Sequence, residues 1–235
     1  MRAPSISIRR GAGVARRFGP WLIVSAVSTA AAGAFVRSGA TDFERFLGPL
    51  PATVTVAAAG AIGLGALAFL ETRGFWRHAC GARVMRGLVV ATTAAVPFAA
   101  VAIGADLAAG FPHDTNVVWP GAWLFYAAIL PVAETIFHLL PLALTMAVSG
   151  SWLKGRAIDR RTFGLMLPTA AVEPAAQVAL GSALPAFVVS HVFVFGLVQL
   201  TLLRRYGYLP MLWFRVCYYL LWHVLWGEAR LQLLF

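Results

Sequence analysis

Residues 119–149 read WPGAWLFYAAILPVAETIFHLLPLALTMAVS, and this stretch decides the fold class. It contains no lysine, arginine or aspartate, and its only acidic or basic side chains are Glu134 and His138. A helix rises about 1.5 Å per residue, so about 20 apolar residues cross a hydrocarbon layer about 30 Å thick. The stretch therefore predicts a membrane-spanning helix that tilts, or that begins in the membrane interface near Trp119 and Pro120.

Similar apolar runs recur along the rest of the chain. They cover residues 19–36, 50–70, 87–109, 163–182, 184–203 and 207–226. Of the 235 residues, 60% are hydrophobic and 12% are charged, which excludes an ordinary soluble domain. We therefore predict an all-α transmembrane bundle of about seven spans. It forms a single domain over 19–235, behind a basic tail at 1–18. The first run also fits a cleaved signal peptide, but its length favours a retained helix.

The arginines predict how the spans are oriented. Alternate loops, namely the N-terminal tail, 71–86, 150–162 and 204–205, carry fifteen of the nineteen basic residues, and the intervening loops carry three. Basic loops stay in the cytoplasm, so we expect the N-terminus inside and the C-terminus outside. The net charge of +10 thus reflects topology and does not indicate a nucleic-acid partner. Lys154 is the only lysine, and this bias, with abundant Ala and Gly, indicates a bacterial plasma membrane protein.

Ionisable residues within the predicted spans are few and lie mostly in the second half. Such residues are costly in lipid and usually face a bundle interior or a wet cavity. They are Asp106, Glu134, His138, Glu173, His191, Arg215 and His223. We expect Asp106 to be interfacial, because it lies near the end of its span. The others make residues 119–227 the candidate functional core.

Glu134 and His138 are four residues apart, so they share one face of their helix. Pro131 and Pro141 flank them and interrupt the backbone hydrogen bonds. The pair predicts either a polar pocket or a contact that only ties helices together.

Residues on later spans extend the pattern. By helix rise, His191 and His223 fall within about two turns of each other in depth, and Glu134 is somewhat deeper. Glu173, with Gln177 one turn on, is either a further member of this site or a protonated interhelical contact. Arg215 either extends to the cytoplasmic interface or neutralises Glu173 or Glu134.

Three short motifs occur in a suggestive order. Ala133-Glu134-Thr135-Ile136-Phe137-His138 is similar to Glu-Glu-x-x-x-Arg, with Glu134 on the second glutamate and His138 in place of arginine. Phe187 and His191 match Phe-x-x-x-His. His223 begins His-x-x-x-Asn/Asp, although Gly227 stands at its last position. Over about residues 125–227 the chain resembles the CAAX prenyl endopeptidase and bacteriocin-processing (CPBP or Abi) intramembrane proteases, as a divergent member.

This resemblance implies an intramembrane endopeptidase that cleaves membrane-associated peptides or proteins. Glu134 would be the general base, His191 its partner and His223 the oxyanion donor. His138, Glu173, Phe187 and Gln177 would support them. Glu134, His191 and His223 could instead hold zinc, so the mechanism stays open between a glutamic and a metal-dependent one. Gly227 leaves the oxyanion site without its usual side chain, so an inactive protein is also possible.

Two other functions fit the same residues. A small transporter or proton-coupled carrier would use Glu134, Glu173 and the histidines as relay groups. Helices interrupted at Pro131, Pro168 and Pro174 suit such a carrier. A catalytically inactive immunity or assembly factor would keep the fold and lose the chemistry. In each case membrane lipids are direct partners.

Overall fold

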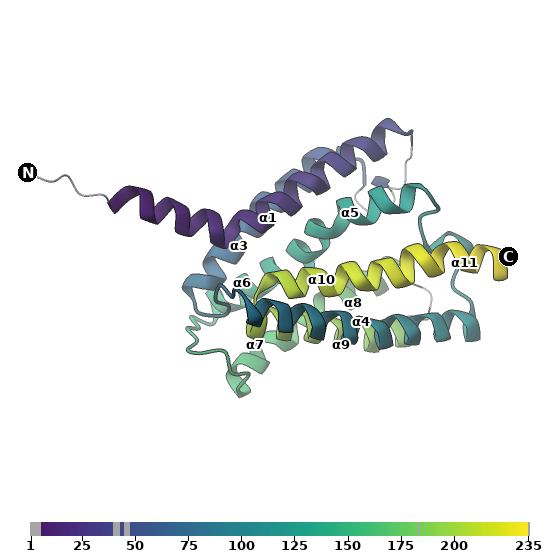
Figure 1. The fold of residues 1–235 in the computed structure, drawn as a ribbon. Coiled ribbons are helices and arrows are strands. Elements are labelled where there is room, and N and C mark those ends of the chain that lie inside the picture. The colour runs from purple at the N-terminus through teal and green to yellow at the C-terminus, as the bar shows by residue number, and fades with distance from the viewer. Residues whose placement is uncertain (1–5, 40–42, 45–47, 183, 235) are drawn as a thin grey trace, which may run out of the picture.

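The computed structural model describes residues 6–39, 43–44, 48–182 and 184–234, and the side chains from residue 17 onward. Throughout these residues the chain is helical and contains no strand, as predicted. The helices run roughly alongside one another (Figure 1). Helix α1 enters at one end of the bundle and α11 closes the chain at the other.

Five helical segments are long and apolar enough to cross a membrane, and each coincides with a predicted span. They are Arg17–Arg37 within α1 (Ile6–Arg37), α3 (Ala52–Thr72), α4 (Ala82–Ala109), Gly121–Val148, and α9 (Pro185–Tyr206). Gly121–Val148 consists of α5 (Gly121–Glu134), the π-helical segment η2 (Thr135–Leu139) and α6 (Leu140–Val148). A 3-10 turn, η1 (His113–Thr115), precedes it.

The other two predicted spans are interrupted. The run at 163–182 forms two short helices, α7 (Arg160–Ala170) and α8 (Val172–Ala179). Pro174 explains the break, because it cannot donate to the carbonyl four residues earlier and its ring crowds that turn. The run at 207–226 forms α10 (Tyr208–Tyr218), the π-helical segment η3 (Tyr219–Leu225) and α11 (Trp226–Leu233).

Small residues let the helices approach closely. Helix α4 packs against α10, and its buried face carries Ala91, Ala95 and Ala99 at four-residue spacing. Helix α1 packs closely against α3, where the Trp21 indole N–H donates to the Gly60 carbonyl at 2.8 Å and a Cβ added at Gly60 would lie 2.8 Å from Ser25. Close backbone approach between small residues is a main source of helix association in lipid.

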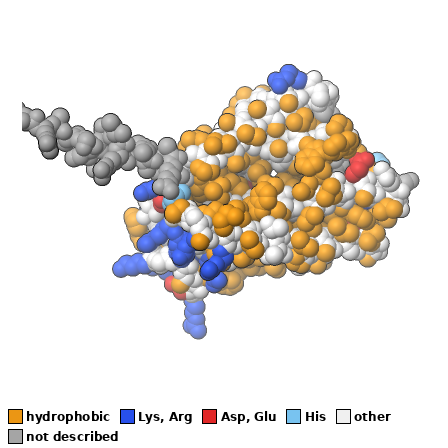
Figure 2. Space-filling model, viewed as in Figure 1, with side chains coloured by type: hydrophobic (Ala, Val, Ile, Leu, Met, Phe, Trp, Pro, Cys, Tyr) orange, Lys and Arg blue, Asp and Glu red, His pale blue; other side chains and the backbone are white. Residues whose placement is uncertain are grey.

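The surface suits a lipid environment. Large apolar side chains face outward along the bundle, including Ile23 on α1, Val54 on α3 and Leu144 on α6. Figure 2 shows this apolar band, with lysine and arginine gathered at one end of the molecule. Apolar side chains this exposed would be unfavourable over most of a soluble protein's surface.

Candidate functional site

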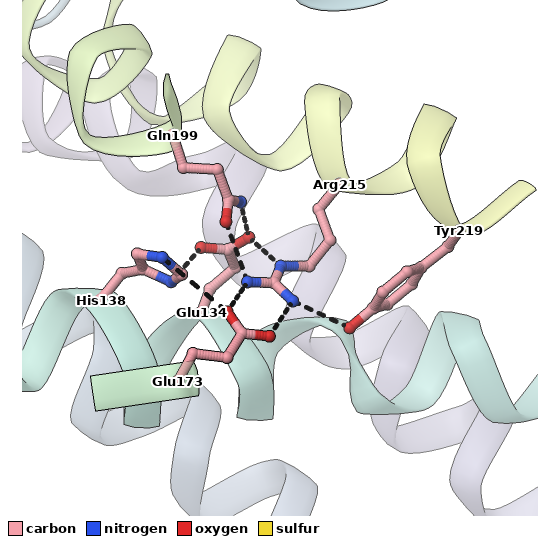
Figure 3. A network of polar contacts seen from close by, with 6 residues as sticks. All are labelled: Glu134, His138, Glu173, Gln199, Arg215 and Tyr219. Atoms are coloured by element: carbon pink, nitrogen blue, oxygen red, sulfur yellow. Dashed lines mark hydrogen bonds and ion pairs between the residues drawn. The ribbon is translucent and has the colours of Figure 1, made fainter. Parts of the chain in front are cut away.

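Six polar side chains from different helices meet inside the bundle (Figure 3). We call Glu134, His138, Glu173, Gln199, Arg215 and Tyr219 the buried polar cluster. They come from α5, η2, α8, α9, α10 and η3 respectively. The residues at its centre are almost fully enclosed, since Glu134, His138 and Gln199 have 0% exposed surface and Arg215 has 2%. The helices thus bring together groups that lie up to 85 residues apart, and they do so away from solvent.

Arg215 organises the cluster. Its Nη1 and Nη2 donate to the two carboxylate oxygens of Glu173 at 3.0 and 2.7 Å, and its Nε donates to Glu134 Oε1 at 2.7 Å. The remaining two N–H groups donate to the Tyr219 hydroxyl at 3.1 Å and to Gln199 Oε1 at 2.9 Å. All five guanidinium donors are therefore used. Arg215 forms an ion pair with each glutamate, so the counter-ion prediction is confirmed and the prediction that it extends to the interface is wrong.

Glu134 is only half satisfied. Its Oε1 accepts from Arg215 Nε and from Gln199 Nε2. Its Oε2 is buried and accepts no hydrogen bond. That oxygen lies 3.5 Å from His138 Nδ1, which also has no hydrogen-bond partner. A buried carboxylate oxygen facing an unpaired imidazole nitrogen is an arrangement that a single proton would complete.

His138 lies between the two carboxylates. Its other nitrogen, Nε2, is 4.0 Å from Glu173 Oε2 and likewise lacks a hydrogen bond. The ring fits there because position 196 on α9 is glycine, where an added Cβ would lie 3.3 Å from Nε2. His138 therefore presents one ring nitrogen towards each glutamate.

The two π-helical segments adjoin the cluster. η2 carries His138 directly after Glu134, and η3 begins at Tyr219, one turn after Arg215. π-Helical turns are rare and often occur at functional sites. Thr135 anchors η2 by donating from its hydroxyl to the Ala59 carbonyl at 3.0 Å. The prolines at 131 and 141, on either side of η2, agree with the predicted interruption of this helix.

His191 makes contacts of its own, outside the cluster. Its Nε2 lies 3.3 Å from the Tyr218 hydroxyl, and its ring stacks on Phe187 with centroids 5.0 Å apart. The Phe187–His191 spacing thus produces a stacked pair on the first turns of α9. The hydrogen bond of His191 goes to Tyr218, not to Glu134.

His223 is bound by a residue from the loop before α5. Its Nδ1 lies 2.6 Å from Asn116 Oδ1, and its ring stacks on Tyr126 at 4.6 Å. Asn116 also lies against Gly227, where an added Cβ would be 3.1 Å from the amide nitrogen. An amide side chain therefore does stand beside His223, supplied by Asn116 instead of by residue 227.

The predicted residues therefore fall into two groups. Glu134, His138 and Glu173 share one cluster, whereas His191 and His223 bond to other partners. The catalytic roles assigned to them stay predictions. In the described part of the chain, no three His, Cys, Asp or Glu side chains are placed to share a metal ion. The zinc site expected from Glu134, His191 and His223 therefore does not fit this arrangement.

The predicted supporting residues have different outcomes. Gln177 is half-buried, and its backbone carbonyl accepts a hydrogen bond from the Ser182 N–H at the end of α8. Sequence reasoning missed Gln199, Tyr219 and Asn116. Gln199 was detectable as an amide within the apolar span 184–203, and Tyr219 as the residue one turn after Arg215. Asn116 lies in a loop and carried no signal.

Comparison of the chain with known protein families, curated proteins and solved structures finds no match. The resemblance to the CPBP proteases thus rests on the three motifs alone.

Proposed function

We propose that the chain is a proton-coupled membrane carrier, with the Glu134–His138 pair as the site that takes up and releases the proton. One observation carries the proposal. Glu134 Oε2 and His138 Nδ1 lie 3.5 Å apart, and both are buried without a hydrogen bond. Ionisable groups at this depth in a membrane protein commonly mark an ion or proton pathway.

Charge balance supports a proton at this place. With both glutamates ionised and His138 neutral, the cluster holds two negative charges and one positive charge, on Arg215. An uncompensated charge in a low-dielectric interior is costly. One proton shared by Glu134 and His138 makes the cluster neutral. Losing that proton makes the closed cluster unstable, which links protonation to a change of conformation.

The position of His138 gives the proton a route. An imidazole can accept a proton on one nitrogen and release one from the other. Nδ1 faces Glu134 and Nε2 faces Glu173, at 3.5 and 4.0 Å. Small movements at these two gaps would pass a proton between the carboxylates. The break between α7 and α8, directly before Glu173, supplies the kind of interrupted helix found at carrier sites.

The carrier would lie in a bacterial plasma membrane with seven spans, its N-terminus inside and its C-terminus outside. The gathering of basic side chains at one end of the bundle supports this orientation. The interrupted segments α7–α8 and α10–η3–α11 would serve as the two spans that complete the seven.

Two measurements test the carrier. Purified protein in nanodiscs is titrated by infrared difference spectroscopy, and we expect a protonated carboxyl band that is lost in Glu134→Gln. Proteoliposomes containing pyranine are then given an inside-negative potassium diffusion potential. Potassium is kept high inside and low outside, and the external buffer contains no further solute, or added sodium, magnesium or a mixture of amino acids.

We expect acidification under at least one external condition, and none with Glu134→Gln. An infrared band without flux under any condition would show that the proton is held but not moved, and would overturn the carrier. Absence of both the band and flux would overturn the proton site as well.

A second candidate, the intramembrane endopeptidase, is favoured by Asn116. Its amide stands beside His223 and fills the space next to Gly227, where the resemblance implies an amide or carboxylate partner. Incubation with a library of fluorescent membrane-spanning peptides tests it. Cleavage that is lost in both Asn116→Ala and His191→Ala would favour the endopeptidase, and no cleavage by the parent protein would remove it.

A further inference from the structure

The basic end of the bundle is built from three loops that arginine side chains hold together. Arg156 donates from Nη2 to the carbonyls of Arg77 and His78, and from Nη1 to the carbonyl of Arg205, all at 3.1 Å. Arg204 is buried, and its guanidinium donates to backbone carbonyls in the segments at 74–75 and 154–157. Its acceptors are Gly74, Phe75, Lys154 and Ala157. The loops at 73–78 and 153–157 and the last turn of α9, at 204–206, therefore form one connected surface.

This surface crowds like charges. Arg77 and Arg83 are exposed, and Arg156 lies against the Arg77 backbone, to whose carbonyl it donates at 3.1 Å. Burial, followed by repulsion from Arg83 and Arg77, lowers the pKa of Arg156 below its ordinary value. In the described part of the chain, no carboxylate forms an ion pair with any of these three arginines. An anion bound beside these three guanidinium groups would offset the repulsion between them.

In a membrane crossed by the adjoining helices, this surface would lie at the depth of lipid headgroups. It joins the end of α3, the start of α4 and the end of α9, three segments long and apolar enough to cross the membrane. Trp152 is 60% exposed beside it, with the Arg73 guanidinium 4.4 Å above its ring. Exposed tryptophan is typical of the membrane–water interface. Anionic phosphodiesters are the anions most concentrated at this depth.

We infer that Arg77, Arg83 and Arg156 form a binding site for the phosphate of an anionic phospholipid. Arg156 is held in place by its carbonyl contacts, and its Nε–H is not used in them. Arg77 and Arg83 supply exposed guanidinium groups, which suit phosphate oxygens. The lipid would balance the charge that the loops bring together. This inference does not depend on the carrier proposal.

Native mass spectrometry from neutral detergent tests the site with added phosphatidylglycerol, phosphatidylcholine or inorganic phosphate. We expect the parent protein to retain one phosphatidylglycerol and to discriminate against phosphatidylcholine. Arg77→Gln with Arg83→Gln should weaken retention about tenfold or more, since each interfacial arginine contributes roughly a fivefold factor. The matched control is Arg86→Gln with Arg160→Gln, which removes two exposed arginines from the same end.

Three results would overturn the site. Equal loss in both double variants would mean a diffuse attraction to the surface. Equal retention of phosphatidylcholine would mean that the phosphate charge is not recognised. Binding of inorganic phosphate as tight as that of phosphatidylglycerol would mean a soluble anion site. Thermal unfolding with and without phosphatidylglycerol gives an independent readout, because a ligand of the folded state raises the midpoint.

Discussion

The bundle contains two buried ion clusters that use similar chemistry and differ in completeness. Near the C-terminal end of α4, both carboxylate oxygens of Asp106 accept hydrogen bonds. Oδ1 accepts from the Phe111 N–H and Arg230 Nη2 at 2.8 and 2.9 Å, and Oδ2 accepts from Arg230 Nε and Trp226 Nε1, both at 2.7 Å. The charge of the Asp106 carboxylate is thus balanced by one counter-ion, Arg230. The interfacial position expected for Asp106 stays a prediction, and its side chain is buried within the protein, with 1% of the residue exposed.

The buried polar cluster has the opposite character. It holds two acids for one arginine, and it leaves Glu134 Oε2 and both ring nitrogens of His138 without hydrogen bonds. A complete pair such as Asp106–Arg230 fixes α11 against α4 and needs nothing more. An incomplete cluster at the centre of the bundle costs stability, and such a cost is usually retained for function. This difference is why we assign the proposed proton chemistry to the buried polar cluster and not to the Asp106–Arg230 pair.

Arg215→Met should have the largest effect on stability. It leaves two buried carboxylates without a counter-ion, and breaking one buried pair already costs about 3–5 kcal/mol. We expect a strongly lowered thermal unfolding midpoint in detergent and no proton flux. A midpoint near that of the parent protein would mean that the cluster is open to water.

Arg230→Met should lower the free energy of unfolding by about 3–5 kcal/mol by the same argument, because it leaves one buried carboxylate, that of Asp106, without a counter-ion. Here a second change, Asp106→Leu, should restore most of the midpoint, because apolar pairs can replace buried ion pairs. Proton flux of the double variant should equal that of the parent. Loss of flux in the restored protein would show that Asp106 also carries function, and the comparison would fail.

Gly196→Ala should destabilise the protein by about 1–3 kcal/mol through overpacking, since its Cβ would press on the His138 ring. Flux should fall because the imidazole is displaced from between the glutamates. Gly65→Ala in α3 is the matched control, as nothing lies within 4 Å of its Cβ. Thermal unfolding and pyranine flux should leave the control unchanged or slightly more stable.

Glu134→Gln should change stability by less than about 1 kcal/mol, because it keeps an acceptor for Arg215 and removes a buried charge. Its effect on flux should nevertheless be complete. A variant that unfolds readily would place Glu134 with the structural ion pairs, and the contrast between the two clusters would be lost.

Asp159 gives the smallest effect. It caps α7, and the hydrogen bond from the Thr162 N–H at 2.7 Å lowers the pKa of its carboxyl below the ordinary value. A lowered pKa stabilises the fold above the unfolded-state value, and this contribution is lost as pH falls through the folded-state value. Asp159→Asn should keep the cap and flatten this acid-side dependence in thermal unfolding scans. An unchanged pH profile would contradict this role.

The spans were predictable because every helix that crosses lipid needs about 20 mostly apolar residues, wherever it lies in the chain. Five apolar runs became helical segments long enough to cross a membrane, one of them with a π-helical segment, and most of the arginines lie at one end of the bundle. The break before Pro174 was readable as a proline effect, but its consequence, two short helices, was not. Glu134, His138 and Glu173 were identified because charge inside an apolar span is rare.

Other features of the site could not be predicted, because they depend on how helices rotate against one another. Depth placed His191 and His223 near Glu134, yet depth does not fix which face a side chain points from. Packing turned His191 to Tyr218 and His223 to Asn116. Asn116 reaches His223 from 107 residues away, and only the folded chain brings them together.

The π-helical segment η3 has a mechanical consequence. A π turn holds one residue more than an α turn, and moving that extra residue along a helix rotates the part it passes by about 100°. The chain after η3 cannot turn freely, because Arg230 clamps α11 to Asp106. The rotation would therefore be taken up on the α10 side, where Arg215 sits. Migration of the extra residue from η3 into α10, past Arg215, would withdraw the guanidinium from both glutamates, while the Arg230–Asp106 pair held α11 in place.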